Sequence, residues 1–244
     1  MNVGPPVLHG EIVSSISLTH DQRARMLDLM ACNFTGIDIG RFENDLAEKP
    51  WTIVLCDSCG NIAGFSTMDV MEAVVGGRLV RAVYSGDTII DSNYRMTTEL
   101  PRAFLRFLAR HTGMERDGAE WYWFYVCKGY RTYRFLPVFY RIFHPHPGAV
   151  VPVFERRVMD RLARVRFGDA YDPTAGIVRV PGDYALRDGV GDITREKMED
   201  PYIRFFSESN PGWVRGEELV CLAPLQRSNF VPKARNWFEK ELSE

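Results

Sequence analysis

Residues 83–108 read VYSGDTIIDSNYRMTTELPRAFLRFL and decide how the rest of the chain is interpreted. The first part is rich in β-branched residues and predicts the end of a strand over residues 79–90. The second part predicts a helix over residues 101–111, because Pro101 is well suited to a first helical turn. Between them, residues 93–98 form a polar junction rather than a buried run, so this strand-to-helix connection is a candidate binding site.

Hydrophobic periodicity and turn signals place further elements on both sides of this stretch. Thr19 is predicted to cap a first helix, with Gln22 as its capping-box partner. The order of strand, helix, helix, three strands, helix, strand and helix predicts a mixed sheet with helices on both faces. The other expected strands are residues 11–18, 51–56, 62–68, 120–127 and 218–222, and the other expected helices are 42–48, 130–143 with an interruption at Pro137, 153–167 and 233–242. Residues 168–217 give no firm prediction, and 169–192 are the best candidate for an insertion or a lid.

Composition narrows the class of protein. The 244 residues are 45% hydrophobic and 25% charged, which is an ordinary globular balance. The net charge of −2 is not that of a nucleic-acid binder, which usually has a strong basic excess. No apolar run approaches the ~20 residues that span a bilayer, and the first residues lack the basic start and apolar core of a secretory signal. Five cysteines without a regular framework favour a reducing, cytoplasmic location.

The order of elements over residues 11–145 resembles the GNAT acyltransferase fold. In that family the fourth strand is followed by a helix whose N-terminus binds the pyrophosphate of coenzyme A, because free amides and the helix dipole favour an anion there. The family pattern is Arg/Gln-x-x-Gly-x-Gly/Ala, and this chain has Arg95-Met-Thr-Thr-Glu-Leu100. Arg95 matches, whereas Thr98 and Leu100 replace the two small residues. The resemblance implies that Arg95, Thr97 and Thr98 bind an acyl-CoA donor.

The replaced glycines leave three alternatives open. Glycine lets the backbone approach a phosphate closely, whereas Leu100 is bulky and Glu99 adds a negative charge beside the anion site. Coenzyme A can be bound less tightly, or the donor can be a phosphopantetheine arm on a carrier protein. A GNAT-like protein that has lost catalysis is the third alternative.

The resemblance also implies a general acid. GNAT proteins carry a Leu-Tyr-x-x-x-Gly-Phe pattern after the fifth strand, and Phe139-Tyr-Arg-Ile-Phe143 is similar, with His-Pro in place of Gly-Phe. The family tyrosine protonates the departing thiolate, so Tyr140 is assigned this role, with Tyr133, two helical turns earlier on the same face, as the second choice. The alternative for both is a core tyrosine whose hydroxyl lies at the rim.

Acyl transfer to an amine needs a base, so that the attacking nitrogen carries a lone pair. Asp87 lies near the end of the 79–90 strand, where GNAT enzymes often place a carboxylate or a water-binding group, and we assign it as that base. Ser85 shares its face at a period of two and is assigned to donor binding. Asp87 follows Gly86, so the alternative is an aspartate that accepts a hydrogen bond from a nearby backbone amide.

Two short motifs suggest metal or redox chemistry, and neither is complete. Cys56-Asp-Ser-Cys59 is a lone CxxC in a predicted hairpin turn, whereas a redox motif is expected to open a helix and a zinc site needs four ligands. His144-Pro-His146 has no further ligands nearby. We therefore predict no metal site.

The predicted helix 153–167 carries an apolar stripe surrounded by basic residues. A basic face of this kind suits an acidic acyl carrier protein or anionic lipid. The alternative is a solvated amphipathic helix that packs its stripe on the sheet. The arginines assigned to a carrier protein are Arg156, Arg157, Arg161 and Arg164.

We therefore expect an α/β (α+β) fold, with a GNAT-like mixed, mostly antiparallel central sheet flanked by helices. Residues 1–150 form the expected core, and residues 151–244 a C-terminal extension that packs on it. The expected function is transfer of an acyl group from a CoA or carrier-protein thioester to an amine or hydroxyl of a small-molecule acceptor. Direct attack is favoured because no Cys-His or Ser-His pair is evident. The alternatives are an inactive GNAT-fold binding or regulatory protein, and a protein that docks on a carrier protein or membrane.

Overall fold

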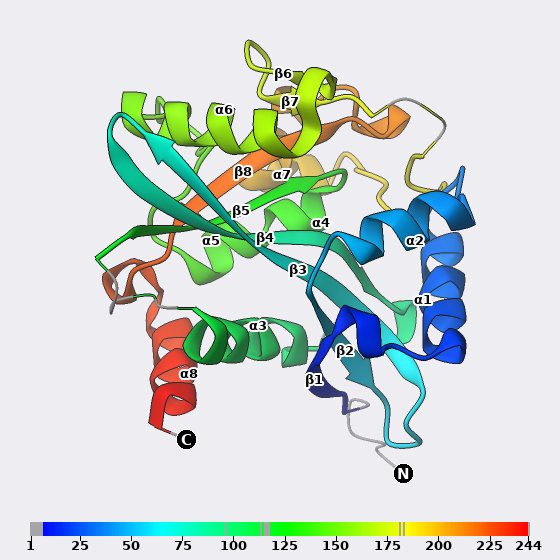
Figure 1. Ribbon diagram of the computed structural model, residues 1–244. Helices are drawn as coiled ribbons and strands as arrows, with labels where there is room; N and C mark the ends of the chain where they lie inside the picture. Colours follow the sequence, from blue (N-terminus) through cyan, green and yellow to red (C-terminus); the bar gives the residue numbers. More distant parts are fainter. Residues whose placement is uncertain are drawn as a thin grey trace.

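A single mixed sheet organises the computed structural model, which describes residues 7–95, 97–112, 114, 118–180, 182 and 184–243 (Figure 1). Within these ranges its eight strands have the order β1-β2-β3-β4-β5-β8-β7-β6. The strands are β1 His9–Ser14, β2 Trp51–Cys56, β3 Ile62–Val75, β4 Arg78–Ile90, β5 Glu120–Cys127, β6 Tyr171–Asp172, β7 Ile177–Val178 and β8 Glu218–Pro224. The α-helices are α1 His20–Asn33, α2 Ile39–Ala47, α3 Glu99–His111, α4 Tyr130–Tyr133, α5 Phe135–Phe139, α6 Val153–Phe167, α7 Pro201–Ser209 and α8 Pro232–Ser243.

Neighbouring strands are antiparallel except β4 and β5, which are parallel and joined through α3. The predicted fold class, a mixed and mostly antiparallel sheet flanked by helices, is therefore confirmed. β8 pairs with β5 from Tyr122↔Pro224 to Cys127↔Leu219, so residues 151–244 contribute strands to the same sheet as the first 150 residues.

Alternation along β5 separates two buried layers, as expected for side chains with a period of two. Trp121, Trp123 and Tyr125 pack with α3, α8 and α7 on one face. Tyr122 and Phe124 pack with α6 on the other face. A third cluster joins α1 and α2 to β2, β3 and the end of β4. Figure 1 shows α3 and α8 together on one side of the sheet and α6 on the other.

Several predicted elements have the predicted bounds, including β2, β5 and α6. The capping box at the start of α1 is present: the Gln22 amide donates to Thr19 Oγ1 at 3.2 Å, and the Thr19 amide donates to Gln22 Oε1 at 2.9 Å. β3 is longer than the expected 62–68, because it pairs along the whole of β4 in one hairpin that turns at Gly76-Gly77.

Two predictions of element bounds are wrong. β1 ends at Ser14 instead of Leu18, because the chain turns into a 3₁₀ helix over Ser15–Ser17 after the last pair, Ser14↔Trp51. The expected helix 130–143 is two short helices, α4 and α5. A proline clashes with the carbonyl four residues earlier, and for Pro137 that residue is Tyr133, the last of α4.

Candidate functional site

A cleft of about 810 Å³ opens where β4 and β5 separate. The two strands pair from Val80↔Glu120 to Ser85↔Tyr125, and beyond these residues β4 continues to Ile90 paired with β3 but not with β5. The cleft is lined by Pro101 and Trp237 from the α3 face and by Arg41 and Phe167 from the α2 and α6 face. It therefore passes through the sheet and gives access to the split from both sides.

A β-bulge in β4 decides which way the side chains at the split point. Met68 of β3 pairs with Ser85 and Ser66 pairs with Thr88, so β4 takes three steps where β3 takes two. Ser85 faces α3, where its hydroxyl accepts a hydrogen bond from Trp123 Nε1 at 2.8 Å. Asp87 faces the opposite side. The prediction that Ser85 and Asp87 share a face is wrong, because the extra residue shifts the alternation by one.

Asp87 lies at the bulge, half-buried, between groups from three distant segments. The Tyr184 hydroxyl donates to its Oδ1 at 3.4 Å. Burial and the charge of Asp87 raise the pKa of Tyr184 well above its usual range, so this tyrosine stays protonated. Asp87 also interacts electrostatically with Lys49 and Lys128, whose pKa values it raises against the effect of burial.

The two lysines are buried at opposite edges of the split. Lys49 is 1% exposed, contacts the Asp45 carboxylate and lies against the backbone of Gly86. Lys128 follows β5, contacts the Glu218 carboxylate and lies 4.1 Å from the centroid of the Tyr184 ring. Burial lowers the pKa of Lys49 to about 8 and that of Lys128 to about 7. The split thus contains the Asp87 carboxylate and two amines whose pKa values are lowered toward neutral pH.

The burial of Lys49 beside Gly86 predicts how the free energy of unfolding depends on pH. The unfolded chain holds a proton on Lys49 up to its ordinary pKa of 10.5, whereas the folded chain releases it near 8. The free energy of unfolding should therefore rise with pH through this window, by at most ~1.4 kcal/mol per pH unit. Lys49→Met should remove that contribution, while Asp45 keeps Arg166 as an ion-pair partner at 3.1 Å. Urea unfolding across this pH range tests it, and parallel profiles for the two proteins would contradict it.

Arg95, Thr97 and Thr98, the residues assigned to a donor, line the cleft on its α3 side. Arg131 and Lys233 line the same end and add positive charge. Burial and the neighbouring charge of Arg131 lower the pKa of Arg95. Met96 of the same motif lies outside the described residues.

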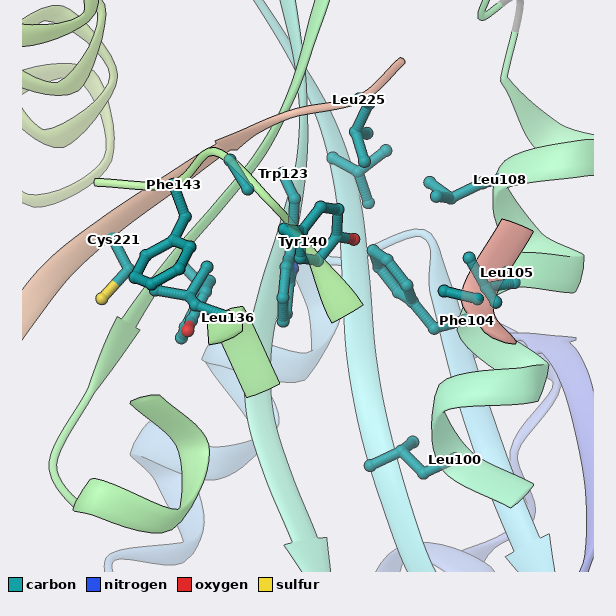
Figure 2. Close-up of a cluster of buried hydrophobic side chains, with 14 of the residues drawn as sticks. Leu100, Phe104, Leu105, Leu108, Trp123, Leu136, Tyr140, Phe143, Cys221 and Leu225 are labelled. Atoms are coloured by element: carbon teal, nitrogen blue, oxygen red, sulfur yellow. The ribbon is translucent and has the colours of Figure 1, made fainter. Parts of the chain in front are cut away.

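Glu99 and Leu100 of the motif point away from this end of the cleft, whereas Thr98 lines it. Glu99 Oε1 accepts a hydrogen bond from the Gly10 amide at 3.2 Å and lies 3.8 Å from Arg106. Leu100 is 5% exposed and packs in the core between α3 and β5 (Figure 2). Among the described residues, the amides of Thr98 and Leu100 have no recorded acceptor. Neither departure therefore obstructs an anion at the start of α3.

The two tyrosines predicted as general acids lie outside the large cleft. Tyr133 is fully buried, and its hydroxyl donates to the Pro145 carbonyl at 2.8 Å. Tyr140 is 3% exposed and lies between Trp123 and α3, with ring centroids 5.5 Å apart for Tyr140 and Trp123 (Figure 2). Tyr140 and Ser85 line a second cavity of about 50 Å³, which shares Gly86 and other lining residues with the cleft. Burial raises the pKa of Tyr140 well above its usual range.

Part of the predicted insertion 169–192 lies along the cleft. Residues 171–178 form the hairpin of β6 and β7, which extends the sheet beyond β8. Tyr184, Leu186, Val190 and Gly191 line the cleft. This segment is attached at both ends: the Thr35 amide donates to the Ala185 carbonyl at 2.8 Å, and Arg131 Nη1 donates to the Val190 carbonyl at 2.6 Å.

Part of the basic face predicted for α6 is exposed to solvent. Arg157, Arg161 and Arg164 are exposed, and Arg156 is half-buried. Arg166 points inward and binds Asp45 and Glu48. In the apolar stripe, Val158, Met159, Leu162 and Ala163 are buried against the sheet.

The remaining sequence motifs contribute nothing to the cleft. The segment from Cys56 to Cys59 forms the hairpin turn between β2 and β3, and both cysteines are free. Within the described ranges, no group of three or more His, Cys, Asp or Glu is placed to bind a metal. Over the same residues, no helix combines the length and the apolar character needed to cross a membrane.

Sequence reasoning missed Lys49, Lys128, Tyr184 and Arg41. Lys128 had a signal in the sequence, because it directly follows the aromatic strand 120–127. A lysine at the end of such a strand is expected to pack its aliphatic stem among apolar residues. Lys49 and Tyr184 had none, since only the tertiary fold brings them to Asp87.

Some solved structures are similar to part of this chain in fold. No model of a protein family matches the sequence, and no curated protein matches it. A conserved Enterococcus faecalis protein of unknown function, described as a probable N-acyltransferase, matches at 13% identity with a TM-score of 0.41, over 55% of this chain and 33% of that one. A GNAT family N-acetyltransferase from Escherichia coli in complex with CoA matches at 16% identity with a TM-score of 0.35, over 50% of this chain and 65% of that one.

Glucosamine-6-phosphate N-acetyltransferase from Arabidopsis thaliana matches at 19% identity with a TM-score of 0.35, over 49% of this chain and 82% of that one. The likeness covers about half of this chain and is confined to the fold.

Proposed function

We propose that this protein transfers an acyl group from a coenzyme A thioester to the amine of a small-molecule acceptor. The observation that carries the proposal is the cleft through the sheet at the split of β4 and β5. One end has a cationic rim at the start of α3, and the other has Asp87 among two buried amines. Such a passage lets a donor and an acceptor enter from opposite faces and meet at the bulge.

The donor is proposed to enter from the α3 face. Arg95, Arg131 and Lys233 supply positive charge for phosphates, and amides in the first turn of α3 add hydrogen-bond donors. Beyond Ser85, β4 has no recorded strand partner on its β5 side among the described residues. An extended arm with amide groups can pair with such a strand edge, as peptides do in β-augmentation. This matches the chemistry of a pantetheine arm.

The reaction is proposed to proceed by direct attack. Asp87 takes a proton from the acceptor amine, directly or through a water molecule. The amine nitrogen then bonds to the thioester carbon and the carbon–sulfur bond breaks. The thiolate receives one proton, and the acylated nitrogen, positively charged at that point, releases one to solvent. Tyr140 remains our proposed source of that proton, since it is protonated and lines the small cavity beside Gly86. Tyr133 is bound to Pro145 and is not part of this proposal.

The donor site can be tested by thermal unfolding with acetyl-CoA, a longer acyl-CoA and CoA. A ligand present at ~100 times its dissociation constant should stabilise the fold by roughly 2.7 kcal/mol, which raises the melting temperature. Arg95→Ala should abolish most of this rise, because it removes a phosphate partner at the start of α3. Arg195→Ala is the matched control, because Arg195 is exposed and does not line the cleft. No shift with any of the three ligands would remove free CoA thioesters as donors.

A carrier-protein thioester is the second proposed donor. The exposed residues Arg157, Arg161 and Arg164 recur at helical spacing on α6 and suit an acidic partner. Binding of an acyl carrier protein that weakens with salt would support this form of the proposal, since exposed charges are screened.

A further inference from the structure

The charged groups on the α2 face of the cleft are almost all paired with one another. Lys49 contacts Asp45, Lys128 contacts Glu218, and Arg166 binds Asp45 and Glu48. Three charged side chains on this face have no ion-pair partner among the described residues. Asp38 caps α2, where its Oδ1 accepts a hydrogen bond from the Arg41 amide. The other two are Asp87, the proposed base, and Arg41, which lies in the first turn of α2 and lines the cleft.

Arg41 has no partner of opposite charge in the part of the chain that the structure describes. Its guanidinium lies over the Tyr184 ring, with Cζ 5.1 Å from the ring centroid. Its backbone amide donates to Asp38 Oδ1 at 2.7 Å, which fixes the residue at the start of the helix. The side chain is thus held at the cleft by an aromatic ring and leaves its N–H groups available.

Asp87 lies at the other end of the same tyrosine side chain. Its recorded hydrogen bond comes from the Tyr184 hydroxyl, and no basic group lies at ion-pair distance from it among the described residues. Tyr184 therefore separates an available carboxylate at its hydroxyl from an available guanidinium over its ring. A ligand that lies along this tyrosine meets a negative charge at one end and a positive charge at the other.

We propose that the acceptor carries an anionic group beside its amine, and that Arg41 binds that anion. The inference rests on the proposed function and names its substrate class: an amino acid or another amine with a carboxylate or phosphate close to it. Arginine binds either anion with two parallel hydrogen bonds, which orients the ligand as well as holding it. The bound anion places the amine at Asp87, at the bulge where the thioester is expected.

A simple amine is a poorer ligand for this site. Its ammonium form can lie at Asp87, but it leaves the Arg41 guanidinium without an anionic partner. An anion on the same molecule supplies that partner. The anion therefore contributes to selection between acceptors and not only to affinity.

The test is direct binding by calorimetry, in the presence of CoA, with matched pairs of ligands. L-leucine and L-phenylalanine are compared with their C-terminal amides, and phosphoethanolamine with ethanolamine. We expect the anionic member of at least one pair to bind about tenfold more tightly or better. The pair that shows the preference identifies the anion as a carboxylate or a phosphate. Arg41→Leu should abolish the preference, whereas Arg195→Leu should retain it.

Equal affinities within every pair, or a preference that persists in Arg41→Leu, would overturn the inference, as would the absence of binding by all six ligands. The thermal shift with CoA, measured on the same samples, reports on the proposed function separately. Anion-selective binding without a CoA shift would leave the inference standing and remove the donor proposal. A CoA shift without anion selectivity would support the donor proposal and overturn the inference about the acceptor.

Discussion

Replacing Asp87 by asparagine should lower the rate of thiol release from acyl-CoA in the presence of an acceptor amine by ~10²- to 10⁴-fold. Asparagine has nearly the same shape, and its side-chain oxygen can still accept the hydrogen bond from Tyr184. It cannot take a proton from the acceptor, so the attacking nitrogen lacks its lone pair. The loss should appear in kcat, because the variant retains the donor site at the other end of the cleft.

The control for Asp87→Asn is binding of CoA. Arg95 and the start of α3 lie on the opposite face of the sheet from Asp87, so the thermal shift with CoA should match that of the unchanged protein. The variant should also lower the pKa values of Lys49 and Lys128 further, because Asp87 raises both. A rate within threefold of the original would show that another group accepts the proton, as would a large loss confined to KM.

The order of the elements could be predicted because each element has its own local signal. The aromatic strand β5 is bounded by polar residues, and the capping box of Thr19 and Gln22 marks the start of α1. These signals act within a few residues, so the sequence shows them directly. The hairpin 171–178 lacked them because β6 and β7 have two residues each and depend on β8 for pairing. The helix α7 was missed although Asp200 and Pro201 form a local start signal.

The site could be predicted only where it follows from the strand-to-helix connection. Arg95, Thr97 and Thr98 meet at the cleft because they are neighbours in sequence. Ser85 and Asp87 were placed on one face because a regular strand alternates, and the bulge opposite Ser66–Met68 breaks that rule. A bulge depends on how two strands pair, which no pattern within β4 alone reveals.

The tyrosine assignments show a different limit of sequence patterns. A helix of aromatic residues predicts burial for all of them, and a hydroxyl at the protein's rim cannot be told from one in the core. Tyr133 is held by the Pro145 carbonyl, in the turn that follows Phe143. Tyr140 reaches only the small cavity beside the cleft. Tyr184, which does reach Asp87, comes from a segment with no periodic signal.

The second large effect is expected from Gly86→Ala at the bulge. A Cβ at this position would lie 2.5 Å from Lys49 Cε and 2.5 Å from Thr67 Oγ1, closer than van der Waals contact permits. Lys49 and Thr67 are each 1% exposed, so at least one of these packed side chains must shift to admit the methyl group. The substitution should lower the free energy of unfolding by about 1–3 kcal/mol, as overpacking of a core does. For a chain of this size that corresponds to a fall in melting temperature of roughly 2–12 °C.

The cause of that loss can be isolated with two further variants. Gly40→Ala is the matched control, since the nearest atom to its Cβ is Asp38 Oδ1 at 3.4 Å and alanine suits the α2 helix. It should leave stability unchanged or raise it by up to ~1 kcal/mol. In a Lys49→Ala background one of the two close contacts is absent, so Gly86→Ala should destabilise the protein less there. An equal loss in both backgrounds would show that Lys49 does not fill the space above Gly86. That outcome would contradict the close contact between the Lys49 side chain and Gly86 at the split.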